Sequence, residues 1–157
     1  AERKQEIARY KKELTNLSAT PADLKQGREI FNLICGQCHT LFGIGGKVGP
    51  DITGSNRSDL DYLLHNILDP NGEIPNDYRT TNVETKDERS LTGVITQQNP
   101  RTITLVTAAE ILTLARDDIA VMTASELSMM PEGLLQVLNP TQVKQLIAYL
   151  QSPRQVK

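Results

Sequence analysis

The stretch Cys35-Gly36-Gln37-Cys38-His39 sets two thiols and an imidazole on one short arc of backbone. If the stretch is helical, Cys35 and Cys38 lie about one turn apart on the same face, so both sulfur atoms can form thioethers with the two vinyl groups of a porphyrin. His39 follows directly, which lets one ring nitrogen bind the iron while the other donates to a nearby carbonyl. The spacing therefore predicts a covalent haem c attachment site.

Two other kinds of site use the same residue types. A zinc site needs four ligands, and Cys35, Cys38, His39 and His65 are all the cysteines and histidines of the chain. The adjacent Cys38 and His39 are awkward co-ligands, and the absence of a second C-x-x-C or an H-x-x-x-H disfavours zinc. A thioredoxin-like redox pair needs a preceding strand, whereas the residues before the motif have helical signals.

The composition is that of an ordinary, mildly acidic globular chain. The length of 157 residues predicts one domain, and 38% apolar content with a net charge of −2 indicates no nucleic-acid or anionic-membrane partner. Only 4% of the residues are aromatic, so a large apolar cofactor would supply part of the core. No apolar run approaches the length of a transmembrane segment, so we expect none in this chain.

The beginning of the chain, Ala1-Glu2-Arg3-Lys4, is not typical of a signal peptide. Covalent haem attachment requires reduced thiols and export machinery, so the haem assignment predicts a periplasmic or otherwise exported protein whose leader is not in this chain. Residues 1–19 are charge-rich and are expected to form a linker helix or a solvated tail packed along one edge of the domain. Their apolar residues follow a thin helical stripe formed by Ile7, Tyr10, Leu14 and Leu17.

A helix start precedes the cysteine motif. Thr20-Pro21-Ala22-Asp23 combines a hydroxyl N-cap, a proline at the first helical position and an acid near the positive end of the helix dipole. Inside this helix Gly27 costs about 1 kcal/mol relative to alanine, which predicts that another helix approaches closely there. The expected partner is a final helix that begins at Asn139-Pro140-Thr141-Gln142 and would meet Gly27 near Ile147 and Leu150.

A loop, a short helix and a sheet are expected between these two helices. Five glycines and Pro50 make residues 43–54 a loop over the haem, and Pro50 is expected to offer its carbonyl to the motif histidine. Ser58 is expected to cap a helix over residues 59–68 that carries His65 on its polar face. Segments rich in Thr, Val, Ile and Leu then predict four antiparallel strands, at residues 79–85, 91–97, 101–107 and 111–115.

A methionine suited to the sixth coordination position of the iron follows the predicted sheet. In Ser128-Met129-Met130-Pro131 a thioether lies in a proline-containing, non-helical stretch, and His/Met ligation is a common way to hold an electron-transfer haem. Proline after Met130 favours extended geometry at that residue and a fixed projection of its side chain. We therefore predict Met130 as the ligand, ahead of Met129 and His65. Ile119-Ala120-Val121 is expected to begin a further strand, and Met122, which follows it, is expected to fill a core.

Several motifs occur in an order and spacing shared with one family. They are Gly27-x-x-x-Phe31, Cys35-x-x-Cys38-His39, Gly49-Pro50-Asp51, Leu63-Leu64 with Asp69-Pro70, Ser128-x-Met130-Pro131-Glu132-Gly133 and Leu146-Ile147-Ala148-Tyr149-Leu150. Over about residues 21–151 the chain resembles a monohaem class I-type cytochrome c, and more narrowly a bacterial haem-binding domain with a β insertion before its methionine. The resemblance implies that Cys35 and Cys38 attach the haem, with His39 as proximal and Met130 as distal ligand.

Together these expectations describe a mainly α fold, a cytochrome c-like helical haem domain over residues 20–157 after a linker or N-terminal helix over 1–19. A small antiparallel β insertion at about 78–123 would lie between the third helix and the loop of the axial methionine. The expected function is electron transfer by one covalent haem c, for a redox partner or a fused dehydrogenase-type domain, without enzymatic activity. A haem-based gas or redox sensor is the alternative, whereas a peroxidase-like enzyme lacks a distal His or Arg suited to acid–base chemistry.

Overall fold

The computed structural model describes residues 2–157 and divides them into two compact units. The first unit contains the residues up to Pro70 together with Pro131–Lys157, and the second unit is Asn71–Met130. The chain leaves the first unit once and returns once, so the second unit is an insertion in the first. No helix formed by residues 2–157 combines the length and apolarity needed to cross a membrane.

The fold is mixed α and β. Helices account for 37% of the structure and strands for 23%, with four α-helices and a five-stranded antiparallel sheet. The predicted mainly α fold is therefore wrong. The physical reason is that the segment expected to be a small insertion is a complete sheet with a hydrophobic core of its own.

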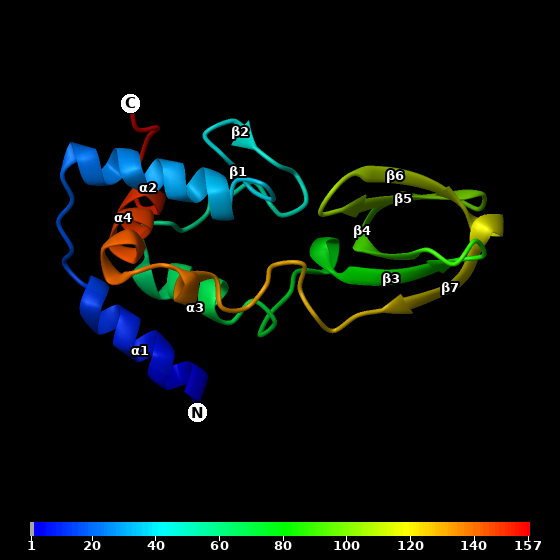
Figure 1. The fold of residues 1–157 in the computed structure, drawn as a ribbon, viewed down its shortest axis with the longest axis horizontal. Helices are drawn as coiled ribbons and strands as arrows, with labels where there is room; N and C mark the ends of the chain where they lie inside the picture. Colours follow the sequence, from blue (N-terminus) through cyan, green and yellow to red (C-terminus); the bar gives the residue numbers. More distant parts are fainter. Residues whose placement is uncertain (1) are drawn as a thin grey trace. The chain divides into compact units, whose positions relative to one another are not determined.

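The first unit is built from helices (Figure 1). They are α1 (Glu2–Leu14), α2 (Pro21–Ile34), α3 (Leu60–Leu68), the 3-10 helix η3 (Leu134–Val137) and α4 (Pro140–Leu150). A two-residue hairpin, β1 (Thr40–Leu41) with β2 (Ile44–Gly45), follows α2, so part of the predicted loop at 43–54 is a strand. The two loop residues, Phe42 and Gly43, have φ of 53° and 81°, as a tight hairpin turn of this length requires.

Helices α2 and α4 both begin at the predicted residues. Thr20 and Asn139 are the N-caps, and each forms a reciprocal capping box with the third residue of its helix. In α2 this partner is Asp23, whose pKa is lowered chiefly by the backbone N–H of Thr20. The two capping predictions are therefore confirmed.

The crossing of α2 and α4 depends on Gly27. A Cβ atom at this position would collide with the carbonyl oxygen of Gln145 and lie 2.8 Å from Tyr149 Cβ. Beside it the rings of Phe31 and Tyr149 pack with their centroids 5.6 Å apart. The predicted close approach is confirmed, but at Gln145 and Tyr149, two residues before the expected Ile147 and one before the expected Leu150.

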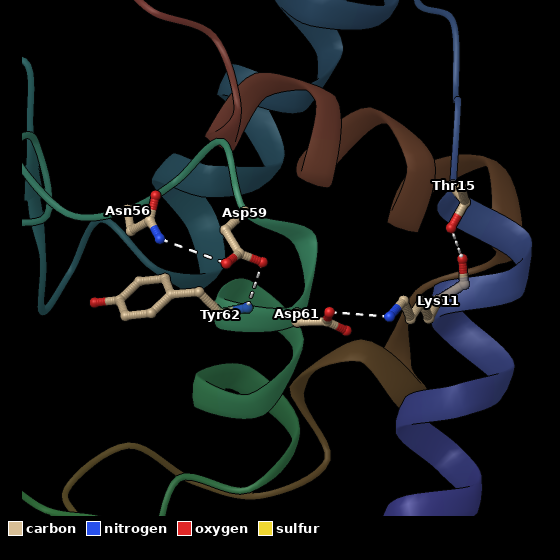
Figure 2. Close-up of polar contacts among 6 residues, drawn as sticks. All are labelled: Lys11, Thr15, Asn56, Asp59, Asp61 and Tyr62. Atoms are coloured by element: carbon tan, nitrogen blue, oxygen red, sulfur yellow. Dashed lines mark hydrogen bonds and ion pairs between the residues drawn. The ribbon is translucent and has the colours of Figure 1, made fainter.

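Helix α1 packs along α3. The side chains that α1 buries are those of Ile7, Tyr10 and Leu14. Lys11 Nζ lies 2.9 Å from Asp61 Oδ2, and Asp59 accepts the backbone N–H of Tyr62 at the start of α3 (Figure 2). Asp59 is thus the N-cap, where the sequence predicted Ser58. Because an exposed ion pair stabilises little, the apolar stripe of α1 is what holds the two helices together.

The second unit is a sheet with the order β6-β5-β4-β3-β7 (Figure 1). Its elements are η1 (Asn76–Tyr78), β3 (Thr80–Thr85), β4 (Ser90–Gln98), β5 (Thr102–Thr107), β6 (Ile111–Ala115), η2 (Arg116–Asp118) and β7 (Ile119–Ala124). All neighbouring strands are antiparallel. One face of the sheet carries the core of the unit, formed by Val83, Ile103, Leu105 and Leu114.

The fifth strand, β7, lies outside the four predicted segments and begins at Ile119, where a strand start was expected. It pairs with β3 and is an edge of the sheet, with Met122 opposite Val83. Met122 is 40% exposed, so the expectation that it fills a core is wrong. An edge strand has a neighbour on one side only, which leaves its side chains less covered than those of the central strands.

Candidate functional site

Helix α2 ends at the first cysteine of the motif. Cys35 is the C-cap of α2, and its N–H donates to Phe31 O at 2.8 Å. The chain then turns, so that the N–H groups of Cys38 and His39 both donate to Cys35 O, at 3.1 and 2.9 Å. The two thiols and the imidazole therefore lie on one turn of backbone at the end of α2, and the cysteines form no disulfide.

The imidazole of His39 is oriented by a single backbone carbonyl. Its Nδ1 lies 2.8 Å from the oxygen of Pro50, the residue whose carbonyl the sequence nominates for this contact. A neutral ring that donates from Nδ1 presents Nε2 as a lone-pair donor, which is the form that binds a metal ion.

The glycine-rich loop lies directly against the cysteine motif. Gly46 N–H donates to Gly36 O and Gly49 N–H donates to Cys38 O, both at 2.8 Å. A Cβ atom at Gly46 would overlap the carbonyl oxygen of Gln37. A Cβ atom at Gly49 would lie 2.7 Å from Cε1 of the His39 ring. Glycine is therefore required for the loop to approach both the backbone of the motif and the imidazole.

The environment of the thiols disfavours a redox-active dithiol. Burial raises the pKa of Cys35 to about 12, and the neighbouring Cys38 adds to this shift. Burial also raises the pKa of Cys38. Both thiols are protonated at neutral pH, whereas catalytic C-x-x-C pairs depend on a lowered thiol pKa. The element before the motif is α2, so the strand expected of a thioredoxin-like site is also missing from this position.

The residues of this site fit a haem c better than a zinc ion. Across residues 2–157, no three His, Cys, Asp or Glu side chains converge to hold a metal ion, and His65 is exposed on α3. Binding of a haem c requires two thiols that form no disulfide and an imidazole held in a fixed orientation. Cys35, Cys38 and His39 supply this set on one turn, with a glycine loop packed against it.

A comparison with known families agrees with this fit. The family model described as cytochrome c oxidase, cbb3-type, subunit III matches residues 22–93. The match supports a cytochrome c family. It contains both cysteines, His39 and Pro50, and it ends before Met130. A cytochrome c domain implies haem c binding and suggests haem-based electron transfer.

Met130, the predicted distal ligand, is not in the same unit as His39. It is the last residue of the second unit, and Pro131 is where the chain re-enters the first. The Met130 N–H donates to Ser128 Oγ at 3.1 Å. The structure thus brings together Cys35, Cys38, His39 and Pro50, whereas the roles of Met130 and Met129 stay predictions.

Arg57 is a buried cation that the sequence did not single out. Its side chain is 8% exposed and its guanidinium lies 4.9 Å from the centre of the Phe42 ring. The guanidinium donates to four backbone carbonyls, those of Ile52, Thr53, Leu150 and Ser152. Since two of these acceptors follow Pro50 and two lie at the C-terminal end of α4, Arg57 ties the loop of Pro50 to that helix.

Replacing Gly49 with alanine should destabilise the chain. The added methyl group would displace the His39 ring or break its contact with Pro50, so we expect a loss of about 1–3 kcal/mol in the free energy of unfolding. Urea denaturation would measure it. The matched control is Gly54→Ala, because a Cβ at Gly54 meets nothing within 4 Å. Equal free energies of unfolding for the two variants would show that the loop does not pack on the imidazole.

Proposed function

We propose that the chain is a monohaem electron-transfer module of the class I cytochrome c type, with one haem c attached to Cys35 and Cys38. His39 and Met130 are the proposed axial ligands. The observation that carries the proposal is the 2.8 Å contact of His39 Nδ1 with Pro50 O, because it leaves Nε2 for the iron beside the two thiols. When bound, the haem supplies a one-electron iron couple.

The residues of the proposed site have separate roles in this function. Cys35 and Cys38 anchor the porphyrin, and Pro50 fixes the tautomer and the orientation of His39. Met130 raises the reduction potential, because a thioether ligand favours the reduced iron. Arg57 holds the loop of Pro50 in place through the carbonyls that follow it.

The proposal extends to the setting of the module. Its domain would run over residues 20–157 and contain the second unit as an insertion. Because haem attachment needs export machinery, we place it in the periplasm or another exported compartment. Its partner would be a redox protein or a fused dehydrogenase-type domain. The module exchanges electrons and carries out no chemistry on a substrate.

A redox titration of the protein, produced with haem-attachment machinery, tests the function. We expect a single reversible one-electron transition and little binding of carbon monoxide to the reduced protein, because His39 and Met130 would both bind the iron. Rapid carbon monoxide binding by the wild-type chain, with no iron–thioether band in the oxidised form, would contradict the electron-transfer function and favour a gas sensor.

A further inference from the structure

The two ends of the second unit are joined beside Met130. Asn71 is the first residue of this unit and Met130 is the last. The side chain of Asn71 accepts the backbone N–H of Ser128 through Oδ1 at 2.7 Å. Ser128 Oγ in turn accepts the backbone N–H of Met130 at 3.1 Å. Both hydrogen bonds are partly buried, so two side chains connect the start of the unit to the amide of its last residue.

These bonds restrain the backbone of Met130 from its N-terminal side. A serine hydroxyl that accepts the N–H two residues ahead closes a small turn and fixes the intervening dihedral angles. Pro131 restricts the same residue from its C-terminal side, because a following proline disfavours the helical region. Among residues 2–157, no hydrogen bond restrains the Met129 amide in the same way. The restraints therefore act on Met130 and not on the adjacent Met129.

We propose that Asn71 and Ser128 are positioning residues for the Met130 thioether. Asn71 fixes the Ser128 backbone, and Ser128 fixes the Met130 amide, so the β unit limits the freedom of the sixth ligand. This inference rests on the proposed function, since it assumes that Met130 binds the iron. It gives the inserted unit a role in keeping the distal ligand in place.

The chain offers a matched control for the loss of such a bond. Ser125 Oγ accepts the N–H of Leu127 at 3.1 Å, in the same pattern two residues ahead and in the same segment. Ser125→Ala therefore removes an equivalent hydroxyl without touching the amide of Met130. Asn71→Asp is a second control, because a carboxylate oxygen can still accept the Ser128 N–H.

The test compares Asn71→Leu and Ser128→Ala with these controls in the haem-loaded protein. The readouts are the iron–thioether band of the oxidised form and the rate of carbon monoxide binding to the reduced form. One neutral hydrogen bond changes an equilibrium by about 2- to 12-fold, so carbon monoxide binding should accelerate by that factor in both variants. Ser125→Ala and Asn71→Asp should keep the wild-type rate.

The outcomes separate this inference from the function on which it rests. A wild-type protein without the thioether band contradicts His/Met ligation, and the positioning role falls with it. A wild-type protein with the band, together with variants no faster than Ser125→Ala, overturns the positioning role and leaves the function standing. If Asn71→Leu does not fold, Ser128→Ala decides alone, because it removes a single oxygen atom.

Discussion

Alanine at position 130 is expected to abolish the weak red-region absorption band of an iron–thioether bond in the oxidised protein. The reduction potential should fall, by on the order of 0.1 V, since axial ligands set haem potentials over a range of roughly 0.8 V and methionine raises them. The reduced iron should then bind carbon monoxide readily. Absorption spectra of Met130→Ala in both oxidation states, with a redox titration, measure all three effects.

Two variants serve as controls for this result. Met129→Ala removes the neighbouring thioether, and His65→Ala removes the other histidine, which is exposed on α3. Neither should change the band, the potential or carbon monoxide binding. Persistence of the band in Met130→Ala with its loss in Met129→Ala would move the ligand by one residue.

Leucine at position 27 should lower the free energy of unfolding. The Cβ atom alone would meet the carbonyl oxygen of Gln145, which cannot move unless α4 moves with it. We expect a loss of about 1–3 kcal/mol, more than the gain of about 1 kcal/mol from replacing glycine in a helix. Because α2 ends at Cys35, the fraction of protein that acquires haem should fall as well.

Urea denaturation of Gly27→Leu and Gln26→Leu would measure this effect. Gln26 precedes Gly27 in α2 and is exposed, so leucine there should change the free energy of unfolding by less than about 0.5 kcal/mol. If the urea concentration at the unfolding midpoint of Gly27→Leu equals or exceeds that of the wild type, α2 and α4 do not cross at this residue.

Elements with local signals could be predicted from the sequence. Thr20 and Asn139 are followed by proline and a polar third residue, and both cap helices as expected. The strand at Ile111–Ala115 has the predicted bounds. The start of α3 differs by one residue, since Ser58 and Asp59 are both good caps and only the backbone geometry selects Asp59.

The fold class could not be predicted because it depends on pairing between distant segments. Strand β7 joins β3 from far along the chain, and nearly all of its residues are exposed, so it lacks the alternation that marks a half-buried strand. Its inclusion helps to make the insertion a five-stranded sheet with its own core. Local patterns showed four strands and the start of a fifth, but not the pairing of β7 with β3, and led to the mistaken expectation of a mainly α fold.

The residues of the candidate site also differ in whether the local sequence predicts them. Cys35, Cys38 and His39 lie within five residues, so their shared turn follows from the motif itself, and Pro50 is the one proline in the sequence of the predicted loop. Arg57 carries no such signal, because nothing near it in the sequence indicates that four carbonyls from two segments converge on its guanidinium. The hydrogen bond between Asn71 and Ser128 could not be predicted either, since the two residues are far apart in the chain.

The attachment of the haem to Cys35 and Cys38 is the central claim, and one measurement tests it directly. The protein, produced with haem-attachment machinery, is extracted with acidified organic solvent, and its chain is analysed by denaturing electrophoresis and intact mass. Two thioether bonds survive these conditions, so haem staining should follow the chain and its mass should exceed that of the polypeptide by one haem. Recovery of free haem with unmodified chain, or of stoichiometric zinc without iron, would contradict the account.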